Sequence, residues 1–144
     1  MINEDAVIDS LLRLIPKIEK EWKEHLCFWG NGDRGRYNDI AVFAQKIVDD
    51  YESKNTRYYD ALFEEIENII INGDCRARDL IGIGLLEDIQ TISSWRSFGY
   101  SVFEKWMKKN TFIVWKEIIR MWDGKSSLMD VVREEKRKQS ENTK

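Results

Sequence analysis

The sequence predicts an all-α fold, either a single-domain helical bundle or a short HEAT-like stack of antiparallel helical hairpins, with about seven helices. Nearly every stretch repeats its apolar residues at helical spacing, and none alternates for long enough to indicate a half-buried strand. One proline and eight glycines interrupt 144 residues, so strong helix breakers are few. The composition is 42% hydrophobic and 34% charged, which suits a packed core but not a membrane protein.

The length fits one domain, which we place at residues 1–132, and residues 133–144 are polar and expected to fray. The longest apolar run, Ile69–Ile71, is far too short to cross a bilayer. The acidic start lacks the basic and apolar regions of a secretory signal, which favours a cytoplasmic location. In the cytoplasm Cys27 and Cys75 stay reduced, and we expect two partly buried thiols.

The first two helices are predicted on either side of Pro16. One covers residues 4–14, and the next begins at Pro16, because the first turn of a helix tolerates the missing N–H of proline. Glycine and asparagine at residues 30–33 end this second helix. Its apolar stripe is predicted to contain Ile15, Ile18, Trp22, Leu26 and Trp29.

The third and fourth helices carry the clearest apolar faces. Asn38 is a good N-cap for the third. The fourth follows residues 53–55 and ends at the turn over residues 72–74. The inner faces are predicted to contain Ile40, Phe43, Ala44, Ile47, Val48 and Tyr51, and then Tyr59, Leu62, Phe63, Ile66, Ile69 and Ile70.

The fifth helix, over residues 75–91, is the most apolar and is predicted to be central. Gly82 and Gly84 are unfavourable inside a helix, so we expect the backbone of another helix to approach closely there. Two further helices are predicted over residues 98–108 and 111–122. Their inward residues are Phe103, Trp106 and Met107, and then Phe112, Trp115, Ile118, Ile119 and Trp122; a last helix would turn inward through Leu128, Val131 and Val132.

The sequence lacks a convincing catalytic or metal-binding group. His25 is the only histidine, so two-histidine metal motifs cannot form, and residues two apart on a helix, such as His25 and Cys27, diverge. Gly82 and Gly84 lie inside an apolar helix rather than at a phosphate-binding turn. The adjacent carboxylates 49–50, 64–65 and 87–88 diverge by about 100°. We predict no enzyme activity, no cofactor and no metal.

Three segments resemble a family of small all-helical bacterial proteins. They are ARDLIGIGLLEDIQ at residues 77–90, LLRLIP at residues 11–16 with Trp22 after it, and FEKW at residues 103–106. The resemblance spans about residues 8–124. Proteins of this kind resemble immunity proteins of polymorphic toxin and contact-dependent growth inhibition systems. The resemblance therefore implies a protein that neutralises a cognate toxin by covering it.

The charge distribution is compatible with such a partner. The net charge is −6 over residues 1–72 and +3 over residues 73–144. Many toxins of these systems act on RNA through basic active sites, so an acidic surface could steer toward one and cover it. We predict a one-to-one complex with a basic nuclease domain, and an RNase is the favoured kind of nuclease. The predicted contact patch contains Asp49, Asp50, Glu52, Asp60, Glu64, Glu67, Glu87 and Asp88.

Two other functions stay open from the residues alone. One is a helical nucleic-acid-binding or other interaction module, in which Trp95 stacks on bases beside Arg96, Lys105, Lys108 and Lys109. The net negative charge of the chain argues against nucleic acid, and nothing indicates a membrane partner. The other is a small enzyme that uses carboxylates alone, which would need two of them to converge in a pocket.

Overall fold

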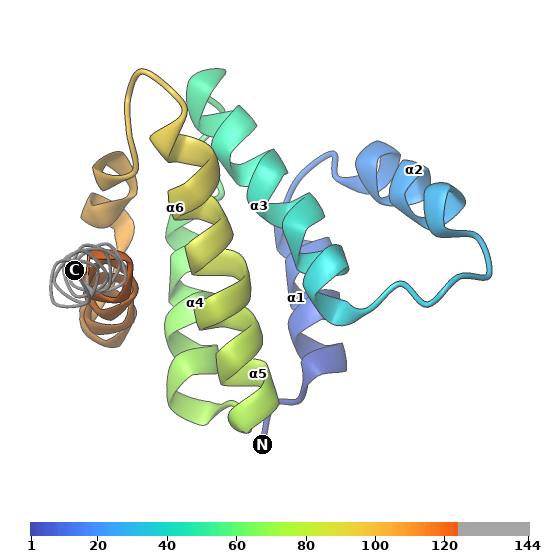
Figure 1. The fold of residues 1–144 in the computed structure, drawn as a ribbon, viewed down its shortest axis with the longest axis horizontal. Coiled ribbons are helices and arrows are strands. Elements are labelled where there is room, and N and C mark those ends of the chain that lie inside the picture. Colours follow the sequence, from blue (N-terminus) through green and yellow to red (C-terminus); the bar gives the residue numbers. More distant parts are fainter. Residues whose placement is uncertain (124–144) are drawn as a thin grey trace, which may run out of the picture.

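In the computed structural model, which describes residues 1–123, the chain is an all-α bundle, as the sequence predicted (Figure 1). The described part contains no β-strand, only one isolated parallel bridge between Ile2 and Gly73. None of its helices is long and apolar enough to span a membrane. The predicted helix through Leu128, Val131 and Val132 and the predicted polar tail lie outside the described residues.

The first helix anchors the N-terminus against the centre of the bundle. Helix α1 (Glu4–Leu14) begins after Asn3, whose side chain accepts a hydrogen bond from the Ala6 N–H, and it buries Val7, Ile8 and Leu11. It packs on α3 (Arg36–Glu52) and α4 (Tyr59–Asn72). Successive helices α3 and α4 run in opposite directions (Figure 1). Their predicted inner faces are confirmed, and most of those residues are completely buried.

The central helix is continuous from residue 75 to residue 94, but its middle is wound differently from its ends. It consists of α5 (Cys75–Asp79), the π-helical segment η1 (Leu80–Leu86) and α6 (Glu87–Ser94). The Glu87 N–H donates to the carbonyl of Gly82, five residues back. This helix packs on both α3 and α4, so its predicted central position is confirmed.

The two glycines of η1 face apolar side chains rather than a neighbouring backbone, and only Gly84 lies in a tight place. A Cβ atom on Gly84 would lie 3.1 Å from the Ile40 Cγ2 atom of α3, tighter than an ordinary van der Waals contact. A Cβ atom on Gly82 would lie 3.4 Å from Val114. The prediction that another helix backbone approaches there is therefore wrong, because the neighbours of both glycines are side chains.

The C-terminal part of the described chain is held by hydrogen bonds from side chains. It consists of the 3₁₀ helix η2 (Ser101–Trp106) and a helix described over residues 109–123. The Trp115 Nε1–H donates to Glu104 at 3.0 Å, and the Gln90 amide donates to the Trp115 carbonyl at 3.1 Å. Phe103, Trp115 and Ile118 are buried as predicted, whereas Trp122 is 46% exposed.

Helix α2 (Glu19–Trp29) lies at one side of the bundle, at the right of Figure 1. It begins three residues after Pro16, because Ile15 to Ile18 form a turn rather than the first turn of the helix. None of its own residues is buried, so the predicted stripe enters the core only through Ile15 and Ile18. Trp22 still stacks on Phe43, with ring centroids 5.4 Å apart.

A buried carboxylate attaches α2 to α3. The Asp39 side chain is 1% exposed and lies 2.8 Å from His25 Nε2 and 2.5 Å from Arg34 Nε. The single histidine therefore joins two helices, with a loop arginine on the same acceptor. Cys27 and Cys75 are both exposed, which corrects the prediction that they are partly buried.

Candidate partner-binding surface

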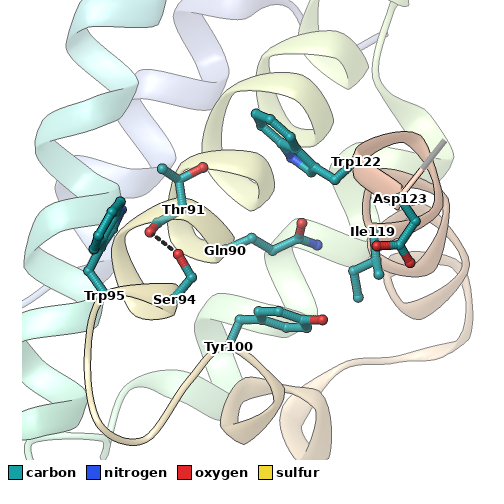
Figure 2. Close-up of a pocket in the computed structure, with 8 residues that line it drawn as sticks. All are labelled: Gln90, Thr91, Ser94, Trp95, Tyr100, Ile119, Trp122 and Asp123. Atoms are coloured by element: carbon teal, nitrogen blue, oxygen red, sulfur yellow. Dashed lines mark hydrogen bonds between the residues drawn. The ribbon is translucent and has the colours of Figure 1, made fainter. Parts of the chain in front are cut away.

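An apolar groove lies between α6 and the helix over residues 109–123 (Figure 2). It has a volume of about 360 Å³. We call it the tryptophan groove, and its lining consists of Gln90, Thr91, Ser94, Trp95, Tyr100, Ile119, Trp122 and Asp123. Trp95 is 86% exposed, as the sequence predicted from its position at a helix end. A large exposed aromatic side chain beside an apolar hollow is typical of protein interaction sites.

The end of α6 fixes where Trp95 points. The Ser94 hydroxyl donates to the Thr91 carbonyl at 2.7 Å, the bond that Figure 2 marks between these residues. The Trp95 N–H donates to the Ile92 carbonyl at 3.2 Å. These bonds keep the backbone helical through Trp95 while its indole stays outside the core. The Gln90 amide, also on α6, donates to the Trp115 carbonyl and so joins α6 to the helix that forms the other wall.

An arginine clamp adjoins Trp95. The guanidinium of Arg96 donates to Asp49 at 2.9 Å and to Glu52 at 2.8 Å, joining the end of α6 to the end of α3. The hydrogen bond that Arg96 donates to Asp49, together with the negative charge of both carboxylates, raises the pKa of Arg96 above its ordinary value. Both carboxylates are about half exposed, so they still face solvent beside the groove.

Two members of the predicted acidic patch have internal roles instead. Asp50 is buried and accepts hydrogen bonds from the Lys46 ammonium at 2.9 Å and the Tyr58 hydroxyl at 2.6 Å. Glu67 is buried and accepts four hydrogen bonds from the backbone and side chains of Asn110 and Thr111. Both carboxylates are buried and already accept hydrogen bonds from groups of this chain, so neither belongs to an exposed acidic contact patch.

The other four predicted carboxylates lie on two helices. Asp60 and Glu64 are exposed on α4, and no ion pair within residues 1–123 involves either of them. Glu87 and Asp88 are half-buried on α6. The structure therefore joins Asp49 and Glu52 through Arg96, but no contact links that pair to Asp60 and Glu64.

Asp88 has a raised pKa and lies on the same face of α6 as Trp95. Residues at spacings of three, four and seven share a helix face, which aligns Asp88 with Thr91 and Trp95. Burial and, secondarily, the charge of Glu87 raise the pKa of Asp88 from 3.8 to about 6. A cation placed beside Asp88 would relieve that cost, because it would favour the ionised carboxylate.

Two of the basic residues proposed to bind nucleic acid already contact other groups of this chain. Arg96 is held by two carboxylates, and the Lys105 ammonium lies 4.4 Å from the centre of the Trp106 ring. Trp106 is itself half-buried against the core. Within residues 1–123, no group of three or more histidine, cysteine or acidic side chains has the geometry to hold a metal ion.

The sequence identified Trp95 but missed the groove and the Arg96 clamp. Arg96 is 44 and 47 positions away from its two partners, so no local spacing could pair them. The only local signal is the Trp95-Arg96 pair at a predicted helix end, which the sequence had suggested for base stacking.

Comparison with protein families finds a matching family model. A family model described as a domain of unknown function, DUF7674, matches residues 8–123, nearly the same span as the resemblance found in the sequence. A search of curated proteins gave no match, and neither did a search of solved structures. The matched description names no activity or partner, so the resemblance to immunity proteins stays a hypothesis.

Proposed function

This chain belongs to the DUF7674 family, and we propose that it is an immunity protein that binds and neutralises a cognate toxin domain. The proposed partner is a basic nuclease domain, with an RNase as the favoured kind. The two proteins would form a one-to-one complex in the cytoplasm. Inhibition is by occlusion: the immunity protein covers the active site and performs no turnover. The observation that carries the proposal is the exposed Trp95 at the edge of the tryptophan groove.

Trp95 has the properties of an interface anchor. Exposed tryptophan is costly to leave in water, and interface hot spots are enriched in tryptophan and arginine near well-packed pockets. Here Arg96 follows Trp95 directly, and the groove offers an adjacent apolar hollow for a side chain of the partner. The hydrophobic core does not need Trp95, because its large buried side chains pack together without it.

The charges around the groove favour a basic partner. Asp123 lies in the lining, Asp88 shares the helix face of Trp95, and Asp49 and Glu52 together carry two charges against the one of Arg96. A nuclease that binds RNA presents cations for the phosphates. Complementary potentials of this kind speed the encounter and fix the orientation of the complex.

The test is co-expression of this chain with the protein encoded by the gene immediately upstream. We expect a one-to-one complex on gel filtration and protection of cells from that protein. The variants D49N/E52Q and D60N/E64Q each remove two negative charges, so they form a matched pair. The proposal expects D49N/E52Q to slow association and D60N/E64Q to leave it nearly unchanged. Lack of both binding and protection would refute the proposal.

A further inference from the structure

A second hollow has four cations among its eight lining residues. It lies between the turn joining α1 to α2, the last turns of α3 and the loop before α4, and it has a volume of about 440 Å³. We call it the lysine pocket; its charged and hydroxyl groups come from Lys17, Lys46, Asp50, Lys54, Arg57 and Tyr58. Four cations and one carboxylate give it a local charge of +3 in a chain whose net charge is −3.

Most of that positive charge is unpaired. Lys46 and Tyr58 both donate to the buried Asp50, which neutralises one cation and orients the phenol. Within residues 1–123, none of Lys17, Lys54 and Arg57 takes part in an ion pair. Three cations that share one concave wall without counterions repel one another, and an anion between them would relieve that repulsion.

The backbone shows that two of these lysines occupy unfavourable positions. Lys17 has a φ of 59° and Lys54 a φ of 64°, and they are the only non-glycine residues with positive φ in the described chain. Lysine in the left-handed region is strained, whereas glycine is not. Strained positions that cluster around one hollow are a feature of functional sites.

Lys54 occupies a position where glycine is the usual residue. The Lys54 N–H donates to the Tyr51 carbonyl and the Asn55 N–H to the Asp50 carbonyl, the two bonds of a Schellman motif that closes α3. The left-handed residue of that motif is most often glycine. Lys17 follows Pro16 in a turn, another place where positive φ favours glycine or asparagine. Lysine at both places gives the pocket two positive charges, although its backbone conformation there is less favourable than that of glycine.

From these observations we propose that the lysine pocket binds the phosphate groups of a phosphorylated small molecule. A phosphate monoester carries about two negative charges at neutral pH, close to the unpaired charge of the pocket, whereas one carboxylate carries a single charge. The volume exceeds that of a phosphate group alone and falls within the range of small-ligand sites. The aliphatic stems of the lysines and the ring of Pro16 offer apolar contact to the rest of such a molecule.

The test uses pyrophosphate as the probe, titrated into the full chain at low ionic strength and followed by amide chemical shifts. We expect saturable binding that shifts the amides of Lys17 and Lys54. The decisive variant is K17G/K54G, because glycine relieves the backbone strain while it removes two cations. It should melt at a higher temperature than the parent chain and bind pyrophosphate roughly tenfold more weakly or worse.

The matched control is K108A/K109A, which removes two exposed lysines from another part of the surface. It changes the net charge equally and should keep the affinity. Three outcomes would overturn the proposal: no saturable binding, equal weakening in both double variants, or stronger binding of an acidic hexapeptide than of pyrophosphate. The first and second outcomes would indicate a positive electrostatic potential without a binding site. The third outcome would indicate that the ligand is an acidic segment of a protein.

Discussion

The buried carboxylate of Glu67 on α4 caps the start of the last described helix through Thr111, accepting from its N–H at 2.7 Å and from its hydroxyl at 2.8 Å. The other carboxylate oxygen accepts the N–H and side-chain amide of Asn110. One side chain therefore positions the helix that forms a wall of the tryptophan groove.

Replacing Glu67 by alanine should destabilise the chain by about 3 kcal/mol, because two helix N–H groups and a hydroxyl lose their buried acceptor. Urea denaturation measures the change. The control E64A, one turn earlier on an exposed position of α4, should stay within about 0.5 kcal/mol of the parent chain. Equal effects of the two variants would contradict the capping role.

The contribution of Glu67 to the free energy of unfolding should depend on pH. Burial alone would raise its pKa, but the hydrogen bonds from Thr111 and Asn110 outweigh burial and lower the pKa below 4.5. A pKa that is lower in the folded state gives stability that is complete above the unfolded value and is lost as pH falls through the folded one. The free-energy difference between the parent chain and E67Q should thus be constant above about pH 5.5 and shrink toward pH 3. A difference that grows on acidification would contradict this assignment.

Asp88 should behave in the opposite sense. Its folded-state pKa of about 6 lies above 3.8, so ionisation costs stability as pH rises between these values. D88N should stabilise the free chain by about 1 kcal/mol at pH 7.5, after allowance for solvent screening of a half-exposed group, and by almost nothing below pH 4. Thermal melts across pH measure this, with the exposed-site variant D60N as the control.

The D88N variant also distinguishes the effect of Asp88 on the stability of the free chain from its effect on binding. If a basic partner covers Asp88, D88N should weaken the complex while it stabilises the free chain, and complex formation near pH 6 should release protons. Calorimetry in buffers of different ionisation enthalpy detects that release. A complex with no proton release near pH 6 would place Asp88 outside the interface.

Trp95 should matter for the complex and not for the fold. W95A removes a side chain that is 86% exposed, so unfolding should change by less than about 0.5 kcal/mol. The dissociation constant should rise by about thirtyfold, corresponding to the roughly 2 kcal/mol of a hot spot. F28A is a matched control, because Phe28 is 83% exposed on α2. Equal losses of affinity from both variants would indicate a different interface.

Asp39 should determine how firmly α2 is attached. D39N weakens its contacts with His25 and Arg34 without changing the size of the side chain. Because α2 buries none of its own residues, amide exchange over residues 19–29 should accelerate by about tenfold, while α4 keeps its protection. The exposed loop variant D33N should leave both unchanged. Uniform acceleration would mean global destabilisation instead.

The sequence predicted the helices well because their signals are local. The apolar spacing of Ile40 to Val48 and of Leu62 to Ile69 directly marks the buried faces. The fate of the carboxylates could not be predicted in the same way. Glu67 lies on α4 where the last helix happens to begin, and Asp50 lies beside Tyr58, which is brought back by the loop. Only the tertiary arrangement separates these acceptors from exposed carboxylates such as Asp60.

The winding of η1 sets which residues of α6 face the core. One residue corresponds to a turn of about 100° in a helix, so a rotation of α6 by that angle against α5 would carry the completely buried Ile89 and Ser93 out of the core. Asp88, Thr91 and Trp95 would leave their outward positions in the same rotation. The direction in which Trp95 faces is therefore fixed together with the buried face of α6, and it cannot be changed without rebuilding the core.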